Sequence, residues 1–304
     1  MSKFKIPTPK ELLDAGVHLG HQSKSWHPRM ESYIYATRKG IHVIDLEKTQ
    51  KALEKAANFL YEIAKDGGQV IFVGSKRQAS EVIAQEAIRS GALYVNERWL
   101  GGTLTNSTVI KKNIKKLLDL KKRKESGQLL MYTKKEQLLL DREIQKLENS
   151  VGGILALKGI PKAIFVVDIK REKTAVTEAK KMGVAVVGIV DTNSDPSLVD
   201  IAIPGNDDAL RSILAITKVI ADAIEKGYKE FDNKSNEVAN KHSEEKEIDV
   251  KIEIDASIDP DAAVEVEPVA QVLKENNDSE YTESLKEPKK LKTKTSSPKA
   301  KKGK

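Results

Sequence analysis

A glycine turn carries the most suggestive chemistry in the sequence. In QVIFVGSKRQASE (residues 69–81), an apolar run reaches Gly74 and is followed by Ser75, Lys76 and Arg77. A buried strand that turns into a basic helix start is typical of a phosphate site, because helix N-termini attract anions. Dinucleotide and P-loop fingerprints need further glycines or Gly-Lys-Ser/Thr, which are absent here, so we expect no nucleotide cofactor. We interpret Ser75 as an N-cap, and Lys76 and Arg77 as candidates for contact with an RNA phosphate.

Three histidines lie close together near the N-terminus, at His18, His21 and His27. Three aspartates follow the ends of expected strands, where α/β sheets gather their ligands: Asp191, Asp207 and Asp208. A mixed His/Asp cation site is therefore one alternative. The other is that the histidines hydrogen-bond backbone or phosphate groups. We assign no metal, although the sequence leaves open whether a cation binds near His21.

The segment NERWLGGTLTN (residues 96–106) combines a cation, a large ring, two glycines and small polar groups. Arg98 and the glycine pair favour an approaching sugar-phosphate strand, because a backbone without side chains can be reached closely. The alternative is that the glycines only turn the chain. Trp99 is expected in the core. The other candidate contacts in this segment are Gly101, Gly102, Thr103 and Asn106.

Catalysis has no positive support in the sequence. There is no cysteine nucleophile, no Gly-x-Ser-x-Gly elbow and no carboxylate pair with acid/base spacing. DTNSDPSLVD (residues 191–200) has the composition of a turn between strands. We therefore expect a protein that is not an enzyme. The chain start has no apolar leader and no run is long enough to span a membrane, so we expect a cytoplasmic location.

Strands and helices alternate along most of the chain. Apolar runs predict five strands at residues 70–74, 92–95, 163–168, 184–190 and 200–204. Helical patterns are found in three places: after Ser75, at residues 172–182 and at residues 207–226. Strands that are apolar on both faces and separated by helices predict an α/β fold, with a parallel sheet covered on both faces in a Rossmann- or flavodoxin-like arrangement.

The N-terminal region has two clear helix starts. Thr8 and Glu11 form a capping-box pattern, and Asp45 is expected to cap a helix that ends near Asp66. Between them we expect a loop over residues 18–30, followed by two short strand-like runs, SYIYATRKG and IHVIDL.

Nearly seventy residues separate Val95 from Ala163, too many for one crossover. Two apolar stripes at helical spacing predict an antiparallel helical hairpin inserted over about residues 103–150, with Thr133 capping its second helix. Residues 111–150 hold 12 Lys/Arg against 6 Asp/Glu. This excess favours phosphate contact, although an ordinary solvated coiled coil also exposes charges.

Charge divides the chain into parts. Residues 235–285 carry 15 Asp/Glu against 4 Lys, and residues 286–304 carry 9 Lys against 1 Glu. Residues 1–234 therefore have a net charge of +10, which favours nucleic acid as a partner. We predict a folded domain over 1–232. The sequence predicts that residues 233–304 form a disordered extension, since their apolar residues are sparse.

Three motifs resemble the bacterial ribosomal protein S2 family: residues 12–49, ERWLGGTLTN (97–106) and residues 191–213. The resemblance covers residues 6 to about 228. It implies a sheet domain with a protruding helical hairpin and a structural role in the small ribosomal subunit. The implied partners are small-subunit ribosomal RNA and other small-subunit proteins, including the large messenger-binding one.

The resemblance also implies which residues make contacts in the ribosome. Matching motifs imply RNA or assembly contacts at His18, His21, Arg29, Arg38, Arg98, Gly101, Gly102, Thr103 and Asn106. Charge alone adds Lys111, Lys112, Lys115 and Lys116. The rival hypothesis is a nucleotide- or sugar-phosphate-dependent enzyme on a doubly wound fold, which the sheet pattern by itself allows.

Overall fold

The computed structural model describes residues 4–256, and the surroundings of side chains through residue 234. The chain divides into two compact units, Met1–Ser243 and Glu244–Lys304, and both β-sheets lie in the first. Within the described residues, every helix is too short or too polar to cross a membrane.

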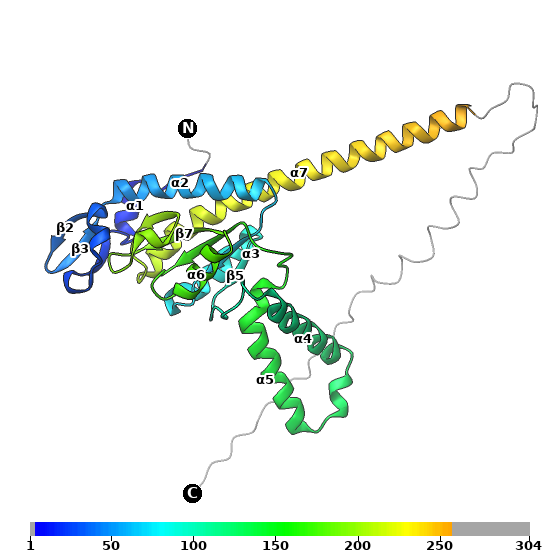
Figure 1. The fold of residues 1–304 in the computed structure, drawn as a ribbon, viewed down its shortest axis with the longest axis horizontal. Coiled ribbons are helices and arrows are strands. Elements are labelled where there is room, and N and C mark those ends of the chain that lie inside the picture. Colours follow the sequence, from blue (N-terminus) through cyan, green and yellow to red (C-terminus); the bar gives the residue numbers. More distant parts are fainter. Residues whose placement is uncertain (1–3, 257–304) are drawn as a thin grey trace, which may run out of the picture. The chain divides into compact units, whose positions relative to one another are not determined.

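A five-stranded sheet forms the centre of the first unit (Figure 1). Its strands are β4 (Val70–Val73), β5 (Leu93–Val95), β6 (Ala163–Val167), β7 (Ala185–Val190) and β8 (Ile201–Pro204). They lie in the order β5-β4-β6-β7-β8, and all neighbouring pairs are parallel. The predicted α/β class and its parallel sheet are therefore confirmed.

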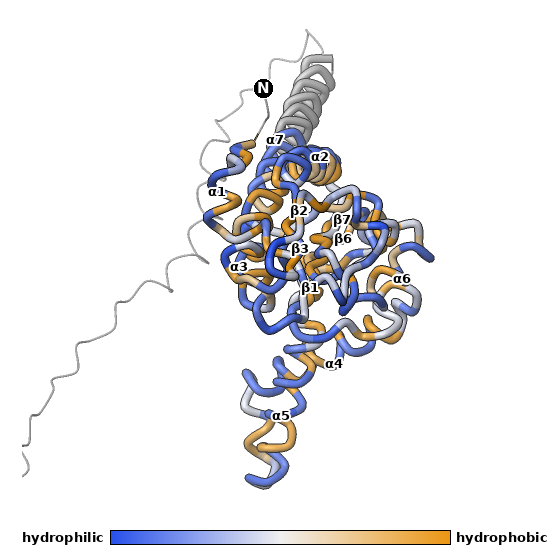
Figure 2. Tube along the Cα trace, turned by 90° about the vertical axis from the view of Figure 1, so that its left-hand side faces the viewer, coloured by the Kyte–Doolittle hydropathy of each residue, from blue (hydrophilic) through white to orange (hydrophobic). Residues whose placement is uncertain are grey.

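Both faces of this sheet are buried. Along β4, Val70 and Phe72 belong to one apolar cluster, and Ile71 and Val73 belong to the other. This alternation follows from the two-residue period of a strand. Phe72 of β4 packs against Phe165 of the neighbouring strand β6, with 5.3 Å between their ring centres. The apolar runs of the sequence thus supply two cores. Figure 2 shows hydrophobic stretches of the chain in the interior around β6 and β7.

Helices cover each face. The first cluster includes side chains of α1 (Pro9–Asp14), α2 (Leu46–Lys65), α3 (Arg77–Ser90) and α7 (Leu210–Ala256). The second includes those of α6 (Lys173–Lys181). Both predicted N-caps are confirmed, since Thr8 forms a complete capping box with Glu11, and Asp45 accepts from two N–H groups of α2.

The interpretation of Ser75 as an N-cap was wrong. Helix α3 begins at Arg77, with Lys76 as its N-cap and no side-chain cap bond. Ser75 instead donates both its N–H, at 3.0 Å, and its hydroxyl to Glu172. The Ser75 side chain, which the local sequence pattern predicted to cap the helix, is therefore bonded to the buried Glu172 carboxylate instead.

A second, antiparallel sheet lies before α2. It contains β1 (Leu19–Gln22), β2 (Ile34–Arg38) and β3 (Ile41–Ile44) in the order β1-β3-β2. We expected β2 and β3 but placed β1 in a loop. That strand is short and its pairing with β3 is irregular, so it leaves little periodic signal. Two 3-10 turns follow it, η1 (Ser23–Ser25) and η2 (Pro28–Tyr33).

The long interval between β5 and β6 holds two helices that run in opposite directions, α4 (Ser107–Glu125) and α5 (Lys134–Val151) (Figure 1). Their connection includes η3 (Gln128–Met131), and Thr133 forms a capping box with Glu136. The 3-10 turn η4 (Gly152–Ile154) follows α5. Outside this interval, the 3-10 turn η5 (Pro196–Leu198) lies between β7 and β8. The buried seam of the pair consists of Ile110, Leu117, Leu120, Leu129, Ile144 and Val151.

The end of α7 differs from expectation. We predicted disorder from Asn233, whereas the helix continues through Ala256. Its Glu, Lys and Ala residues favour helix, and extending an existing helix avoids the cost of nucleation. The first compact unit runs from Met1 to Ser243, and the boundary of the folded domain at residue 232 stays a prediction. The expectation for residues 257–304 lies outside the described residues.

Candidate nucleic-acid interface

The carboxyl ends of the strands hold a cluster of charged groups, which we call the carboxyl-edge cluster. The Lys76 ammonium lies 2.7 Å from Asp207, 2.6 Å from Asp208 and 3.6 Å from Asp168. Lys76 follows β4, Asp168 follows β6, and the other two follow β8. The cluster consists of His21, Lys76, Asp168, Asp191, Asp207 and Asp208.

Close packing brings His21 to this edge from the smaller sheet. A Cβ on Gly20 would lie 2.6 Å from the Thr192 methyl, so only glycine lets β1 approach. The His21 N–H donates to the Thr192 hydroxyl at 2.8 Å. Its Nδ1 lies 3.0 Å from Asp191 and its Nε2 lies 3.4 Å from Asp208. The glycine beside the histidine is therefore needed for this contact.

Burial and neighbouring charges shift the ionisation of the cluster. Burial, with help from Asp191 and Asp168, raises the pKa of Asp207 to about 7 despite its bond to Lys76. Burial alone would lower the pKa of Lys76, but its carboxylate partners raise it instead. The hydrogen bond to Asp191 raises the pKa of His21. One ammonium thus serves several carboxylates, so the cluster favours cations over phosphates.

The geometry of the cluster also allows the alternative of a His/Asp cation site. Ligand atoms of His21, Asp191 and Asp207 lie within 4.8 Å of one another. One imidazole nitrogen and two carboxylate oxygens are suitable donors for a divalent ion. Because Lys76 already contacts Asp207, an ion there would share that carboxylate with the ammonium. The cluster is fully accounted for by its internal ion pairs and hydrogen bonds.

The 96–106 segment divides into exposed and internal positions. Arg98 and Gly101 are exposed, whereas Trp99 is 6% exposed and packs in the core, as expected. The Gly102 N–H donates to Glu178 at 2.7 Å, and the buried Thr103 hydroxyl donates to the Leu100 carbonyl at 2.6 Å. Asn106 is exposed and is the N-cap of α4 without a side-chain bond. The candidates free to meet RNA here are thus Arg98, Gly101 and Asn106.

Six of the seven lysines of α4 divide into two groups, and the seventh, Lys122, is also exposed. Lys116, Lys121 and Lys124 form ion pairs across the hairpin with Glu143, Glu148 and Asp141, respectively. Lys111, Lys112 and Lys115 are exposed and form no ion pair with another described residue; we call these three the hairpin cations. An unpaired cation can contact a phosphate without losing an ion pair, whereas a paired cation must first break its bond to a carboxylate.

A groove of about 370 Å³ lies between α5 and the segment before Trp99. Arg98, Arg142 and Lys146 line it against a single carboxylate, that of Glu97. We call it the Arg98 groove. Its positive balance and its position between the sheet domain and the hairpin suit a phosphate backbone. On α3, Arg77 is exposed as a further cation.

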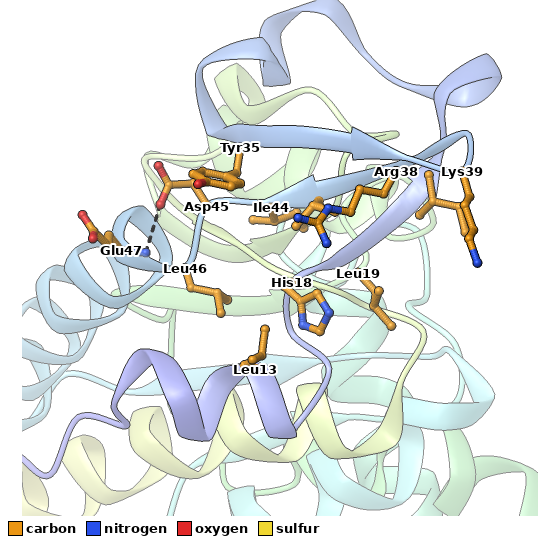
Figure 3. Close-up of a pocket in the computed structure, with 12 residues that line it drawn as sticks. Leu13, His18, Leu19, Tyr35, Arg38, Lys39, Ile44, Asp45, Leu46 and Glu47 are labelled. Atoms are coloured by element: carbon orange, nitrogen blue, oxygen red, sulfur yellow. Dashed lines mark hydrogen bonds between the residues drawn. The ribbon is translucent and has the colours of Figure 1, made fainter.

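The remaining predicted residues lie near the smaller sheet. Arg29 is 62% exposed and donates to Asp195 at 2.8 Å. Arg38 and His18 line a cavity of about 930 Å³ between α1 and the smaller sheet (Figure 3). This apolar pocket also exposes Leu13, Leu19, Tyr35 and Ile41. Its wall is mostly hydrocarbon, which suits a protein partner better than RNA.

Several structural residues of the site were missed. Asp168 ends the sequence run that predicted β6, and its position there was the available signal; it adopts φ 64°, a conformation tolerated by Asp. Glu172 and Glu178 are buried although charged. Glu172 directly precedes α6 and Glu178 lies within it; from the sequence both look like ordinary surface glutamates, so only the tertiary structure identifies them.

Comparison with known proteins fits this arrangement. The family model described as ribosomal protein S2 matches residues 12–227. The chain belongs to the ribosomal protein S2 family. One relative is the "Small ribosomal subunit protein uS2c" of Cyanophora paradoxa, 51% identical over 222 residues, which cover 73% of this chain and 95% of the relative. The S2-family match includes the two sheets, α4 and α5.

Proposed function

We propose that this S2-family chain is a structural constituent of the small ribosomal subunit that binds small-subunit ribosomal RNA and has no catalytic activity. The match over residues 12–227 carries the proposal, supported by a close relative named as a small-subunit protein. The net charge of +10 over residues 1–234 is consistent with a polyanionic partner.

The proposed mechanism is geometric. The hairpin cations and the Arg98 groove contact phosphates, which fix orientation without reading base sequence. Specificity then comes from the fit of folded RNA to the sheet domain and hairpin together. Binding weakens as salt rises, because counterion release drives it. Contacts of this kind support subunit assembly and translation by holding RNA and neighbouring proteins in place.

Sedimentation of a cell lysate through a sucrose gradient tests the proposal. We expect the chain to migrate with small ribosomal subunits and to be nearly absent from the soluble fractions. Washing at high salt should release it. A chain that stays in the soluble fractions and is stabilised against heat by a mononucleotide would instead support the enzyme hypothesis.

The nucleotide alternative meets a physical obstacle at the carboxyl-edge cluster. The strand order changes direction between β4 and β6, the usual ligand site of doubly wound folds. Here Lys76 at that point is already bonded to Asp207 and Asp208. The surrounding carboxylates repel a phosphate, so the same edge that favours nucleotides in other folds disfavours them here.

We further propose that the apolar pocket receives a neighbouring protein, the large messenger-binding protein of the subunit. Exposed Leu19, Tyr35 and Ile41 support a protein partner, because burying them stabilises a protein interface. In ribosomes carrying Ile41→Lys, we expect that protein to be lost while the variant chain itself is retained. Lys51→Ala on the exposed surface of α2 is the control and should retain both.

A further inference from the structure

Glu178 of α6 is bonded to an unusual number of groups in one loop. Its Oε1 accepts from the Gly102 N–H at 2.7 Å and the Trp99 indole N–H at 3.3 Å. Its Oε2 accepts from the Leu104 N–H at 3.0 Å, and from the Thr105 N–H and hydroxyl at 3.4 and 3.3 Å. A single side chain therefore satisfies five donors.

The loop depends on this carboxylate for its shape. Glu178 is 7% exposed, and its bonds to Trp99 and Leu104 are buried, whereas those to Gly102 and Thr105 are partly buried. Gly102 adopts φ 92°, a conformation that favours glycine, and its N–H shares the Glu178 acceptor with those of Leu104 and Thr105. Immediately after Thr105, Asn106 occupies the N-cap position of α4. The carboxylate thus lies at the root of the hairpin.

We propose that Glu178 is a positioning residue whose carboxylate fixes residues 99–105 and thereby sets the direction in which α4 leaves the sheet domain. The same bonds hold Trp99, so they also fix Arg98 opposite Arg142 and Lys146 in the Arg98 groove. The consequence for RNA rests on the proposed function. A rigid hairpin root presents the hairpin cations and the groove to one folded RNA surface together.

Hydrogen exchange on the purified full chain tests the positioning role without RNA. In Glu178→Gln, one end of the amide is an NH2 group that faces N–H donors. We expect the amides of Gly102, Leu104 and Thr105 to exchange faster because they lose their acceptor, by roughly tenfold or more at the buried Leu104 N–H. The strands β4 and β6 should keep their protection.

The matched control is Glu172→Gln, which changes another buried carboxylate at the start of α6 that bonds Ser75 instead. It should leave the amides of residues 102–105 unchanged. Unchanged exchange at these amides in Glu178→Gln, or equal acceleration in β4 and β6, would overturn the proposal. If Glu178→Gln does not fold, Glu178→Asp replaces it, and a smaller acceleration confined to the same amides is expected.

The two tryptophans, Trp26 and Trp99, allow a spectroscopic test. The indole N–H resonance of Trp99 should move in Glu178→Gln and return part of the way in Glu178→Asp, while that of Trp26 stays fixed. No movement of the Trp99 resonance would contradict the bond to Glu178.

Filter binding to a transcript of small-subunit ribosomal RNA tests the functional consequence. We expect Glu178→Gln to bind roughly tenfold more weakly, with Glu172→Gln as the comparison. If the unmodified chain itself fails to bind, the proposed function fails and the exchange result stands alone. Equal RNA affinity of the unmodified chain and Glu178→Gln would overturn the link between Glu178 and RNA.

Discussion

The two groups of lysines on α4 provide a direct test of how the hairpin meets RNA. The perturbation is the triple change of the hairpin cations, Lys111, Lys112 and Lys115, to Gln. The control is the triple change of Lys116, Lys121 and Lys124 to Gln, which removes the same charge from the same helix. The control lysines are already paired with carboxylates of α5. Long-range electrostatics therefore change equally, whereas direct phosphate contacts do not.

The expected effect follows from counterion release. Each lost phosphate contact lowers the slope of log affinity against log salt by about 0.7 to 0.9. Three lost contacts therefore lower the slope by about 2 to 3. Suppose that the unmodified chain and the hairpin-cation variant bind RNA equally at high salt. A fourfold reduction in salt concentration should then make the affinity of the variant lower by about threefold per lost contact, or about 30-fold in total. The paired lysines should give a much smaller slope change, because they are engaged with Glu143, Glu148 and Asp141.

The assay is filter binding of the full chain to a small-subunit ribosomal RNA transcript over a range of salt concentrations. Urea denaturation of both variants checks that the sheet domain remains folded. Equal slope changes in the two variants would show that the hairpin acts only through its net charge. An unchanged slope after removal of the hairpin cations would show that they do not touch phosphate.

Three further outcomes are expected for the free protein. Gly227→Ala places a methyl 2.6 Å from the Ala64 Cβ, where α7 crosses α2, and should lower the free energy of unfolding by about 1–2 kcal/mol; Gly101→Ala has nothing within 4 Å and should be nearly neutral in the same urea denaturation. Burial alone would raise the pKa of Glu178, but its N–H donors hold it below 4.5. Its contribution is therefore present above that value and lost as pH falls through the lowered pKa, so unfolding measured against pH should lose an acid-dependent component in Glu178→Gln. Thr133→Ala removes the capping box of α5 and should weaken the start of that helix by about 1 kcal/mol, measured as faster amide exchange there with β6 unaffected.

The sheet was predictable because its signal is local. Strands such as β4 and β6 are apolar at every position, and this pattern survives without knowledge of their neighbours. The capping boxes at Thr8 and Thr133 were predictable for the same reason. Strand β1 was missed because its stability comes from contacts with β3 and Thr192, which are distant in the sequence.

The site was only partly predictable. The sequence identified the exposed cations by composition, but it gave no means to separate Lys111 from Lys116, since pairing with Glu143 depends on helix packing. It placed Lys76 beside a phosphate, whereas the structure surrounds that side chain with carboxylates. Glu178 had no sequence signal, because its role arises entirely from the loop that folds over it.

The carboxyl-edge cluster makes this edge of the sheet unfavourable for phosphate. In parallel sheets the helix N-termini make the carboxyl edge attractive to anions. Here Asp168, Asp191, Asp207 and Asp208 occupy that edge around Lys76, and burial together with the charges of Asp191 and Asp168 raises the pKa of Asp207 to about 7. A phosphate approaching this edge would meet repulsion. Under the proposed function, we therefore expect the net positive charge of residues 1–234 to meet RNA away from this edge, at the exposed lysines of α4 and the Arg98 groove.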